Sequence, residues 1–219
     1  MIDPIIAIVL SYLETHELVL LCRSETKYRF ITKKFIKEFE LKITDVRSDI
    51  TDDDLEYFKG IRIINLVFCD KITDRGLEYL KGVHTINLSC KMGITDYSLR
   101  YFKGVHTINL SCCYIIMDSG LAYLKGVHTI YLSHCNQITD RGLEYLKGVH
   151  TINLFGCYNI TDRGLEYLKG VHTITLTSKR ITDHGLEYLE GAHSIILYGC
   201  NQITKPASNH IYINDKNLN

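Results

Sequence analysis

VHTIYLSHCNQITDRGLEYL, residues 127–146, recurs with small changes along most of the chain. Each copy follows a Lys-Gly pair, or Glu-Gly in the last copy, and these pairs begin at residues 59, 81, 103, 125, 147, 169 and 190. The interval is 22 residues five times and 21 residues once. An earlier divergent unit ends in ITDDDLEYF, residues 50–58, so about seven to eight units run from residue 40 onward. A fixed period of this length is typical of a solenoid, whose coils pack only on their neighbours.

The spacing of apolar residues changes in the middle of each unit. In the quoted copy, Ile130 and Leu132 alternate with polar or half-polar side chains, which predicts a short strand with one buried face. Thr139 then offers a helix N-cap, Asp140 complements the helix dipole in the first turn, and Gly148 can end the helix in a left-handed conformation. We therefore expect one strand and about two helical turns in each unit.

One unit of this size cannot enclose a core, and the next copy is the surface that completes it. We therefore expect an α/β stack of coils with parallel strands on one face and short helices on the other. Residues 22 apart become neighbours in adjacent strands, so Ile86, Ile108 and Ile130 should lie in one row.

Composition limits the partners and the compartment. Lys and Arg number 25 and Asp and Glu number 25, so no net charge draws the chain to nucleic acid or to an acidic membrane surface. The apolar run from Ile5 to Leu13 is nine residues long and follows no basic residue, so we expect neither a signal peptide nor a membrane span. Eight cysteines without a secretory signal favour free thiols in a reducing compartment, cytoplasmic or nuclear.

Several residue types recur once per copy and would form ladders along the solenoid. We interpret the cysteine ladder as buried thiols, and the Asp at each helix start as a capping charge and not as part of a catalytic pair. The sequence has no Cys-x-x-Cys spacing, nucleophile elbow, phosphate-binding glycine loop or His-Glu zinc motif. We therefore expect no enzyme activity, no cofactor and no metal site. The cysteine ladder consists of Cys69, Cys113, Cys135, Cys157 and Cys200.

A second ladder of histidines stands just before each expected strand. We interpret it as a solvated edge that was copied with the repeat. The alternative is metal binding or pH sensing, because charged neighbours in such a row would repel one another. The six residues are His84, His106, His128, His150, His172 and His193.

The frame VHTIYLSHCNQI, followed by TDRGLEYL, resembles the cysteine-containing leucine-rich repeat of F-box/LRR proteins. The resemblance covers residues 40–204 and implies an α/β solenoid that binds proteins. It also implies a horseshoe arc, with the parallel strands on the concave face and the short helices on the convex face. The present units are shorter than is usual for that subtype. The last unit reads ITKPASNHIYI, with Pro206 where the helix should run, so we expect residues 205–219 to form a terminal cap and a polar tail.

Residues 1–39 contain no repeat and show the apolar spacing of short helices. Their order of Pro, Val, Ser-Tyr-Leu and two further leucines resembles an F-box, which docks on the adaptor subunit of SCF ubiquitin ligases. The leading Leu-Pro of that motif is here Ile2-Asp3-Pro4. The alternative is a helical cap that shields the edge of the first strand. The resemblance implies adaptor contacts by Pro4, Ile5, Val9, Leu13, Leu18 and Leu21.

The outward positions of the strands have no packing role, so they are available for a target. Most of these positions carry small polar residues, and three copies depart from that pattern with aromatic or aliphatic side chains. Exposed aromatic residues on a rigid sheet are frequent anchors of protein interfaces. We therefore expect a target-binding surface made by Tyr131, Phe155, Ile196, Tyr198, Asn87 and Asn109.

These observations lead to one functional hypothesis and one main alternative. In the first, residues 1–39 bind an SCF adaptor, residues 40–204 hold a protein target for ubiquitin transfer by other subunits, and the chain is a monomer within a hetero-complex. In the alternative, the chain is a stand-alone LRR interaction scaffold or a decoy, and its N-terminal helices only cap the solenoid. Neither includes nucleic acid or membrane as a partner.

Overall fold

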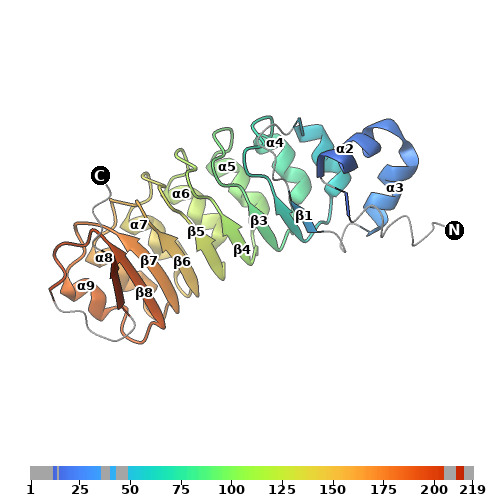
Figure 1. Cartoon of the computed structure of the whole chain (residues 1–219). Helices are drawn as coiled ribbons and strands as arrows, with labels where there is room; N and C mark the ends of the chain where they lie inside the picture. The colour runs from blue at the N-terminus through green and yellow to red at the C-terminus, as the bar shows by residue number, and fades with distance from the viewer. Residues whose placement is uncertain (1–11, 14, 36–39, 43–48, 205–210, 215–219) are drawn as a thin grey trace.

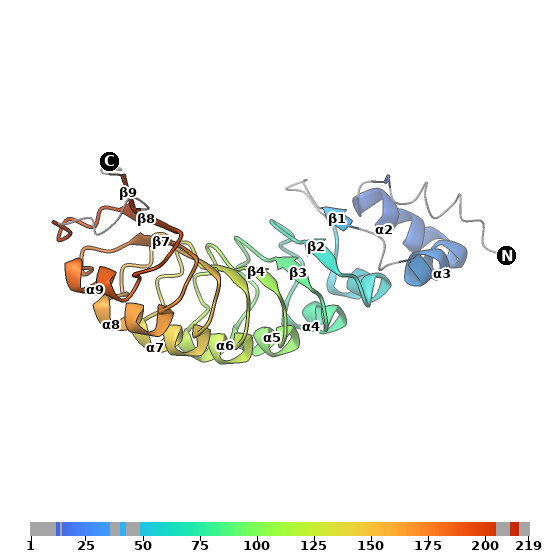
Figure 2. The same ribbon diagram turned by 90° about the horizontal axis from the view of Figure 1, so that it is seen from below.

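The computed structural model describes residues 12–13, 15–35, 40–42, 49–204 and 211–214, and the following account concerns these residues. They form a curved rod of stacked coils with two helices at its N-terminal end (Figure 1). The helices of the repeats follow the outer, convex side and the strands follow the inner side (Figure 2). The architecture is the expected leucine-rich-repeat solenoid.

Nine strands of the described part of the chain form one sheet, in which every pair is parallel and the order follows the sequence. Ile86 lies opposite Ile108, and Ile108 lies opposite Ile130, so the predicted row of isoleucines is confirmed. The strands are β1 (Glu40–Lys42), β2 (Ile63–Asn65), β3 (Thr85–Asn87), β4 (Thr107–Asn109), β5 (Thr129–Tyr131), β6 (Thr151–Leu154), β7 (Thr173–Thr177), β8 (Ser194–Tyr198) and β9 (Ile211–Asn214).

Most repeats contain one turn of α-helix that tightens into a 3₁₀ turn. The tight ending fits the short distance to the Lys-Gly turn, where Gly148 has a φ of +81°, as the sequence predicted. The segments are η2 (Asp52–Phe58), α4 (Asp74–Leu77), η3 (Glu78–Leu80), α5 (Asp96–Leu99), η4 (Arg100–Phe102), α6 (Asp118–Leu121), η5 (Ala122–Leu124), α7 (Asp140–Leu143), η6 (Glu144–Leu146), α8 (Asp162–Leu165), η7 (Glu166–Leu168) and α9 (Asp183–Glu187).

One continuous core runs through the coils, and the cysteine ladder lies inside it, as predicted. The Cys113 thiol donates to the Leu88 carbonyl at 3.2 Å, and the Cys157 thiol donates to the Leu132 carbonyl at 3.0 Å. Burial raises the pKa of Cys113 and of Cys157 to about 12, so these thiols stay protonated at neutral pH.

The Asp ladder does more than cap its own helices, and the interpretation as simple capping charges was wrong in this respect. Asp140 accepts hydrogen bonds from the backbone N–H of Thr161 at 2.8 Å and from its hydroxyl at 2.6 Å. Thr161 belongs to the following repeat. The same pair of bonds recurs along the helix side, so adjacent coils are linked there as well as through the sheet. The spacing places Asp and Thr 21 residues apart, which one sequence copy does not reveal.

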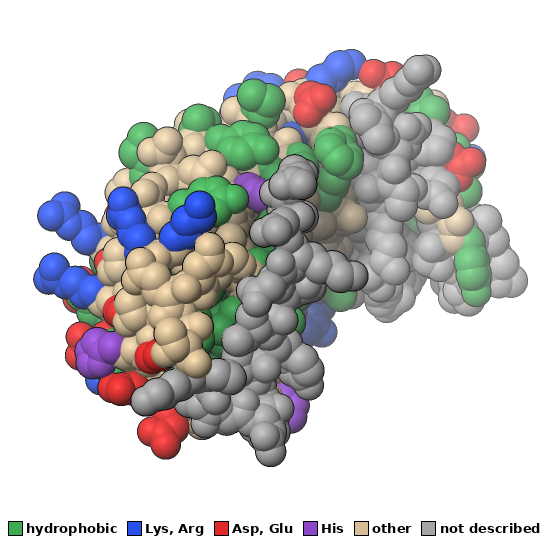
Figure 3. Space-filling view, turned by 60° about the vertical axis from the view of Figure 1, so that its left-hand side comes forward, with side chains coloured by type: hydrophobic (Ala, Val, Ile, Leu, Met, Phe, Trp, Pro, Cys, Tyr) green, Lys and Arg blue, Asp and Glu red, His purple; other side chains and the backbone are tan. Residues whose placement is uncertain are grey.

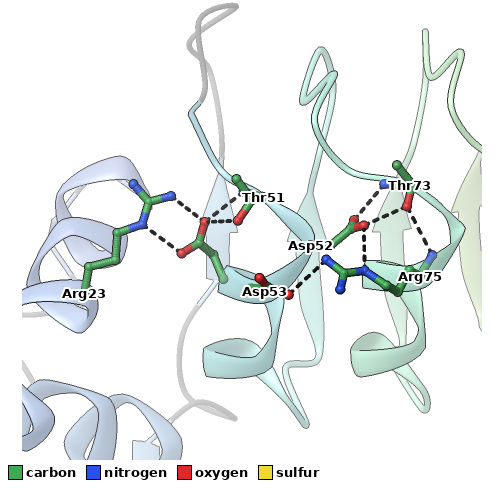
Figure 4. Close-up of polar contacts among 7 residues, drawn as sticks. Arg23, Thr51, Asp52, Asp53, Thr73 and Arg75 are labelled. Carbon is green, nitrogen blue, oxygen red and sulfur yellow. Dashed lines mark hydrogen bonds and ion pairs between the residues drawn. The ribbon is translucent and has the colours of Figure 1, made fainter.

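Two helices, α2 (Thr15–Ser24) and α3 (Thr26–Phe35), close the N-terminal end. Leu18, Cys22 and Ile31 are buried in the same core as the repeats. Where the helices meet the first repeat, Arg23 Nε donates to Oδ1 of the buried Asp54 at 2.9 Å, and Asp54 Oδ2 also accepts from the Thr51 backbone at 2.8 Å (Figure 4). The helices are therefore part of the solenoid body. At the other end, β9 continues the sheet within the segment expected to be a cap and polar tail.

Candidate functional site

The concave face consists of half-buried side chains that alternate with core residues along each strand. Asn87 and Asn109 lie on this face, and each side chain accepts a bond from the backbone N–H two residues later, at 3.0 Å and 2.9 Å. Their Oδ1 atoms are thus engaged in turns that end the strands. In β5 the same position is Tyr131, which lies between Asn109 and Asn153 in the sheet register. A target could contact the free amide groups and the tyrosine side by side.

Two of the predicted target-binding residues meet across three repeats. The rings of Phe155 and Tyr198 are 5.0 Å apart and nearly perpendicular, and Thr177 on β7 is the neighbour of Tyr198 in the sheet register. His134 adds a third ring at 5.1 Å from Phe155, again nearly perpendicular. We call His134, Phe155 and Tyr198 the aromatic cluster. Edge-to-face packing holds these rings in fixed positions, which is a property of interface anchors.

Among the described residues, no ring contact joins Tyr131 to that cluster. Ile196 is aliphatic and has no ring to add. Ile196 lies between Thr175 and Tyr212 in the sheet register. The sequence analysis did not assign His134 to the target-binding surface. The available signal was a departure from the repeat pattern, because His134 stands where the two preceding copies have Cys90 and Cys112. All three residues have a positive φ, which is +61° at His134.

Apolar side chains are exposed in the loops that follow β2, β3, β4 and β6, and the sequence analysis missed them. Their exposed fractions range from 41% to 80%. Tyr114 and Ile115 stand where the quoted copy has Asn136 and Gln137, so departure from the repeat pattern was the available signal. Hydrophobic side chains are visible on the upper part of the molecule in Figure 3. Exposed apolar surface of this kind marks an interaction site. We define the apolar ridge as Phe68, Met92, Tyr114, Ile115 and Tyr158.

The adaptor-binding residues expected from the sequence are only partly in view. Pro4, Ile5 and Val9 lie outside the described residues. Leu18 is 0% exposed and belongs to the core. Its side chain therefore cannot contact a partner in this conformation. Leu13 and Leu21 are half-buried against the same core.

Two other apolar side chains on the N-terminal helices face solvent. Leu20 on α2 is 56% exposed and Phe30 on α3 is 60% exposed. Helical spacing alone indicated an apolar side for each helix, yet it could not show which residues the first repeat covers. Leu20 and Phe30 therefore replace Leu18 as the surface that a helix-binding partner could reach.

The six histidines form one continuous stack. Neighbouring ring centroids are 4.4 to 4.7 Å apart, with interplanar angles of 10° to 16°. Within the column, Nδ1 of His128 lies 3.1 Å from the hydroxyl of Thr129. Desolvation and the neighbouring imidazoles lower the pKa of His84 and of His150. Among the described residues no group of three or more His, Cys, Asp or Glu side chains is arranged to hold a metal ion.

Comparison with known proteins agrees with this architecture. A sequence model of the family described as Leucine Rich repeat matches residues 61–81 and 127–147. A search of curated proteins gave no match. In the part of the chain that is described, no helix combines the length and the apolar character needed to cross a membrane.

Solved structures share the fold at low sequence identity. A chain of the yeast Rad7–Elc1 complex matches with a TM-score of 0.54 and 15% identity, over 87% of this chain and 51% of that one. A chain of the TLR13–ssRNA13 complex matches at 0.53 and 14%, over 66% and 23%. Internalin C2 from Listeria monocytogenes matches at 0.52 and 17%, over 84% and 91%. This chain thus spans about half the length of the Rad7–Elc1 chain. These matches show the leucine-rich-repeat solenoid fold, and the family model matches two of its repeats.

Proposed function

We propose that this chain is the substrate-recognition subunit of an SCF-type ubiquitin ligase. Its N-terminal helices would bind the adaptor, and the aromatic cluster with the apolar ridge would bind the target. The mechanism is proximity, because a subunit that holds both partners raises the effective concentration of the target near the transfer machinery. No catalytic group is required of the chain itself.

One observation carries the proposal: the N-terminal helices share a core with the repeats. Leu18 and Ile31 are buried with the first repeat, and Arg23 pairs with the buried carboxylate of Asp54. A partner on Leu20 and Phe30 would therefore stand at a fixed distance from a partner on the aromatic cluster. The yeast Rad7–Elc1 structure, in which a chain of this fold is part of a two-protein complex, supports a partner-binding role.

The second candidate function is a stand-alone interaction scaffold or decoy. The burial of Leu18 and Val19 favours it, because these residues cover the first repeat as a cap would. The two candidates differ in whether the outer side of α2 and α3 has a partner.

Co-purification with a purified SCF adaptor distinguishes them. The variant Leu20→Ala with Phe30→Ala removes exposed side chains and should leave the fold intact, and Tyr123→Ala, exposed on the convex side, is the matched control. We expect the adaptor to be recovered with the wild type and with the control, and to be lost with the double variant. If the wild type recovers no adaptor, the scaffold function replaces the ligase function.

The target surface needs a separate test. Phe155→Ala with Tyr198→Ala removes two rings of the aromatic cluster and leaves α2 and α3 unchanged. We expect this variant to lose cross-linking to target proteins that the wild type and Tyr123→Ala retain, while adaptor binding persists. Unchanged cross-linking would show that the aromatic cluster is not part of the target-binding surface.

A further inference from the structure

A shallow pocket of about 380 Å³ opens beside the start of α7 and α8, on a side of the solenoid that the proposed function does not use. Its lining includes three guanidinium groups, those of Arg141, Arg163 and Arg180, together with Asn159 and Tyr167. Figure 3, which brings the C-terminal end of the solenoid forward, shows Lys and Arg side chains projecting from one edge.

The positive charge in this pocket is not neutralised as it is elsewhere in the repeats. Arg75 occupies the same position of the TDRG sequence, and it pairs with Asp53 at 3.0 Å and with Asp52 at 3.4 Å (Figure 4). Asp53 lies 22 residues before Arg75. The residue 22 before Arg141 is Ser119, and the residue 22 before Arg163 is Arg141 itself. An acid is thus replaced first by a neutral residue and then by a second cation.

None of the three arginines forms an ion pair with another residue of the described chain. Asp140 also lines the pocket, but both of its oxygens already accept hydrogen bonds from Thr161. The lining itself holds three guanidinium groups and one engaged carboxylate, so its formal charge at neutral pH is about +2. A phosphorylated side chain carries nearly the opposite charge, about −1.5 to −2.

The surroundings favour a compact anion on a protein over a nucleic acid or a membrane. Those larger partners are recognised through an extended basic field, whereas this chain has equal numbers of basic and acidic residues. Guanidinium groups form two parallel hydrogen bonds with a phosphate, and clusters of arginine are a general means of reading phosphorylated peptides. Asn159 and Tyr167 lie at the same pocket and add polar groups beside the arginines.

We propose that the pocket formed by Arg141, Arg163 and Arg180 binds a phosphoserine or phosphothreonine side chain of a partner protein. The proposal rests on the proposed function only in that the solenoid binds proteins, and it requires no adaptor. It adds a second contact surface, apart from the concave face, that responds to the phosphorylation state of the partner.

Peptide arrays with randomised flanks around a central phosphoserine or phosphothreonine, and the same arrays without phosphate, test it on the purified full-length chain. We expect retention on the phosphorylated arrays only. Arg141→Gln with Arg163→Gln and Arg180→Gln should weaken that retention about tenfold or more, because several charge-assisted hydrogen bonds are lost. Arg75→Gln, whose guanidinium is already paired, is the matched control and should retain binding.

Three results would overturn the proposal: no retention of the wild type, equal retention on both arrays, or preferential binding to phosphoinositide-containing vesicles. Thermal melting of every variant checks that the fold is kept. The adaptor experiment is independent of these arginines. Loss of adaptor binding with intact phosphopeptide binding would remove the ligase role and keep the pocket, and the reverse result would remove the pocket alone.

Discussion

Asp118 in one repeat holds Thr139 in the next through two hydrogen bonds, from the backbone N–H at 2.8 Å and from the hydroxyl at 2.6 Å. The Thr139 side chain in turn accepts from the backbone N–H of Arg141 at 3.3 Å and caps its own helix. One carboxylate therefore orders the start of the following helix and joins two coils. This connection explains the Thr-Asp pair in nearly every copy.

Gly142→Ala should destabilise the protein, although alanine is the better helix former. An added Cβ would overlap Asp118 Oδ1 and would lie 3.0 Å from the Leu121 side chain. We expect a loss of about 1 to 3 kcal/mol in the free energy of unfolding, measured by urea denaturation. Asp118→Ala removes the obstructing carboxylate, so the double variant should cost less than the sum of the two single variants. Strict additivity would contradict the close approach.

Met117→Thr should stabilise the protein. Met117 is an N-cap residue without a side-chain hydrogen bond to its helix, whereas the corresponding Thr139 and Thr161 make one. A restored cap contributes about 1 kcal/mol. Thermal melting should show a higher Tm for Met117→Thr and a lower Tm for the reverse change, Thr139→Met. An unchanged Tm for Met117→Thr would mean that Ser119, which already donates to Asp96, takes the place of the missing cap.

Lys91→Cys should also stabilise the protein. Lys91 takes the cysteine position of its repeat, is 1% exposed, and donates to the Cys69 carbonyl. Burial lowers the pKa of Lys91, because desolvation disfavours the ammonium. A lysine whose folded pKa is depressed binds more protons in the unfolded state. Its contribution to stability therefore falls as the pH drops from about 10.4 towards the folded pKa.

Denaturation midpoints between pH 7 and pH 10 check this expectation. The wild type should gain stability with rising pH, and Lys91→Cys should be more stable at pH 7 and show a smaller gain. Lys125→Cys, in an exposed turn, is the control and should leave the slope unchanged. A flat profile for the wild type would show that Lys91 keeps its charge in the folded state.

The histidine stack should weaken the fold in mild acid. Because the pKa values of His84 and His150 are lowered in the folded state, the unfolded chain binds more protons as the pH falls below about 6.5. Stability is then lost until the pH passes the folded pKa values. Tm should fall between pH 7.5 and pH 5.5, and His128→Gln with His150→Gln should reduce that fall by interrupting the column. An identical fall in the variant would assign the effect to other groups.

The repeat period predicted the row of Ile86, Ile108 and Ile130 because each copy imposes the same constraint on the next. It could not predict that Phe155 meets Tyr198, because the two rings lie 43 residues apart and lean across the sheet. Burial of Leu18 was equally hidden. An apolar helix face looks the same in sequence whether the first repeat or a separate protein covers it.

Because the strands follow one another in sequence order, the length of the solenoid is set by the number of repeats. Every coil adds one strand at a spacing of about 4.8 Å, and each new copy repeats the same Asp-to-Thr connection. Duplication or loss of one 22-residue unit between α3 and β5 would therefore move the aromatic cluster one step away from the N-terminal helices, or one step closer, while the core keeps its register. The reach between two partners can thus change in whole steps without redesign of either binding surface.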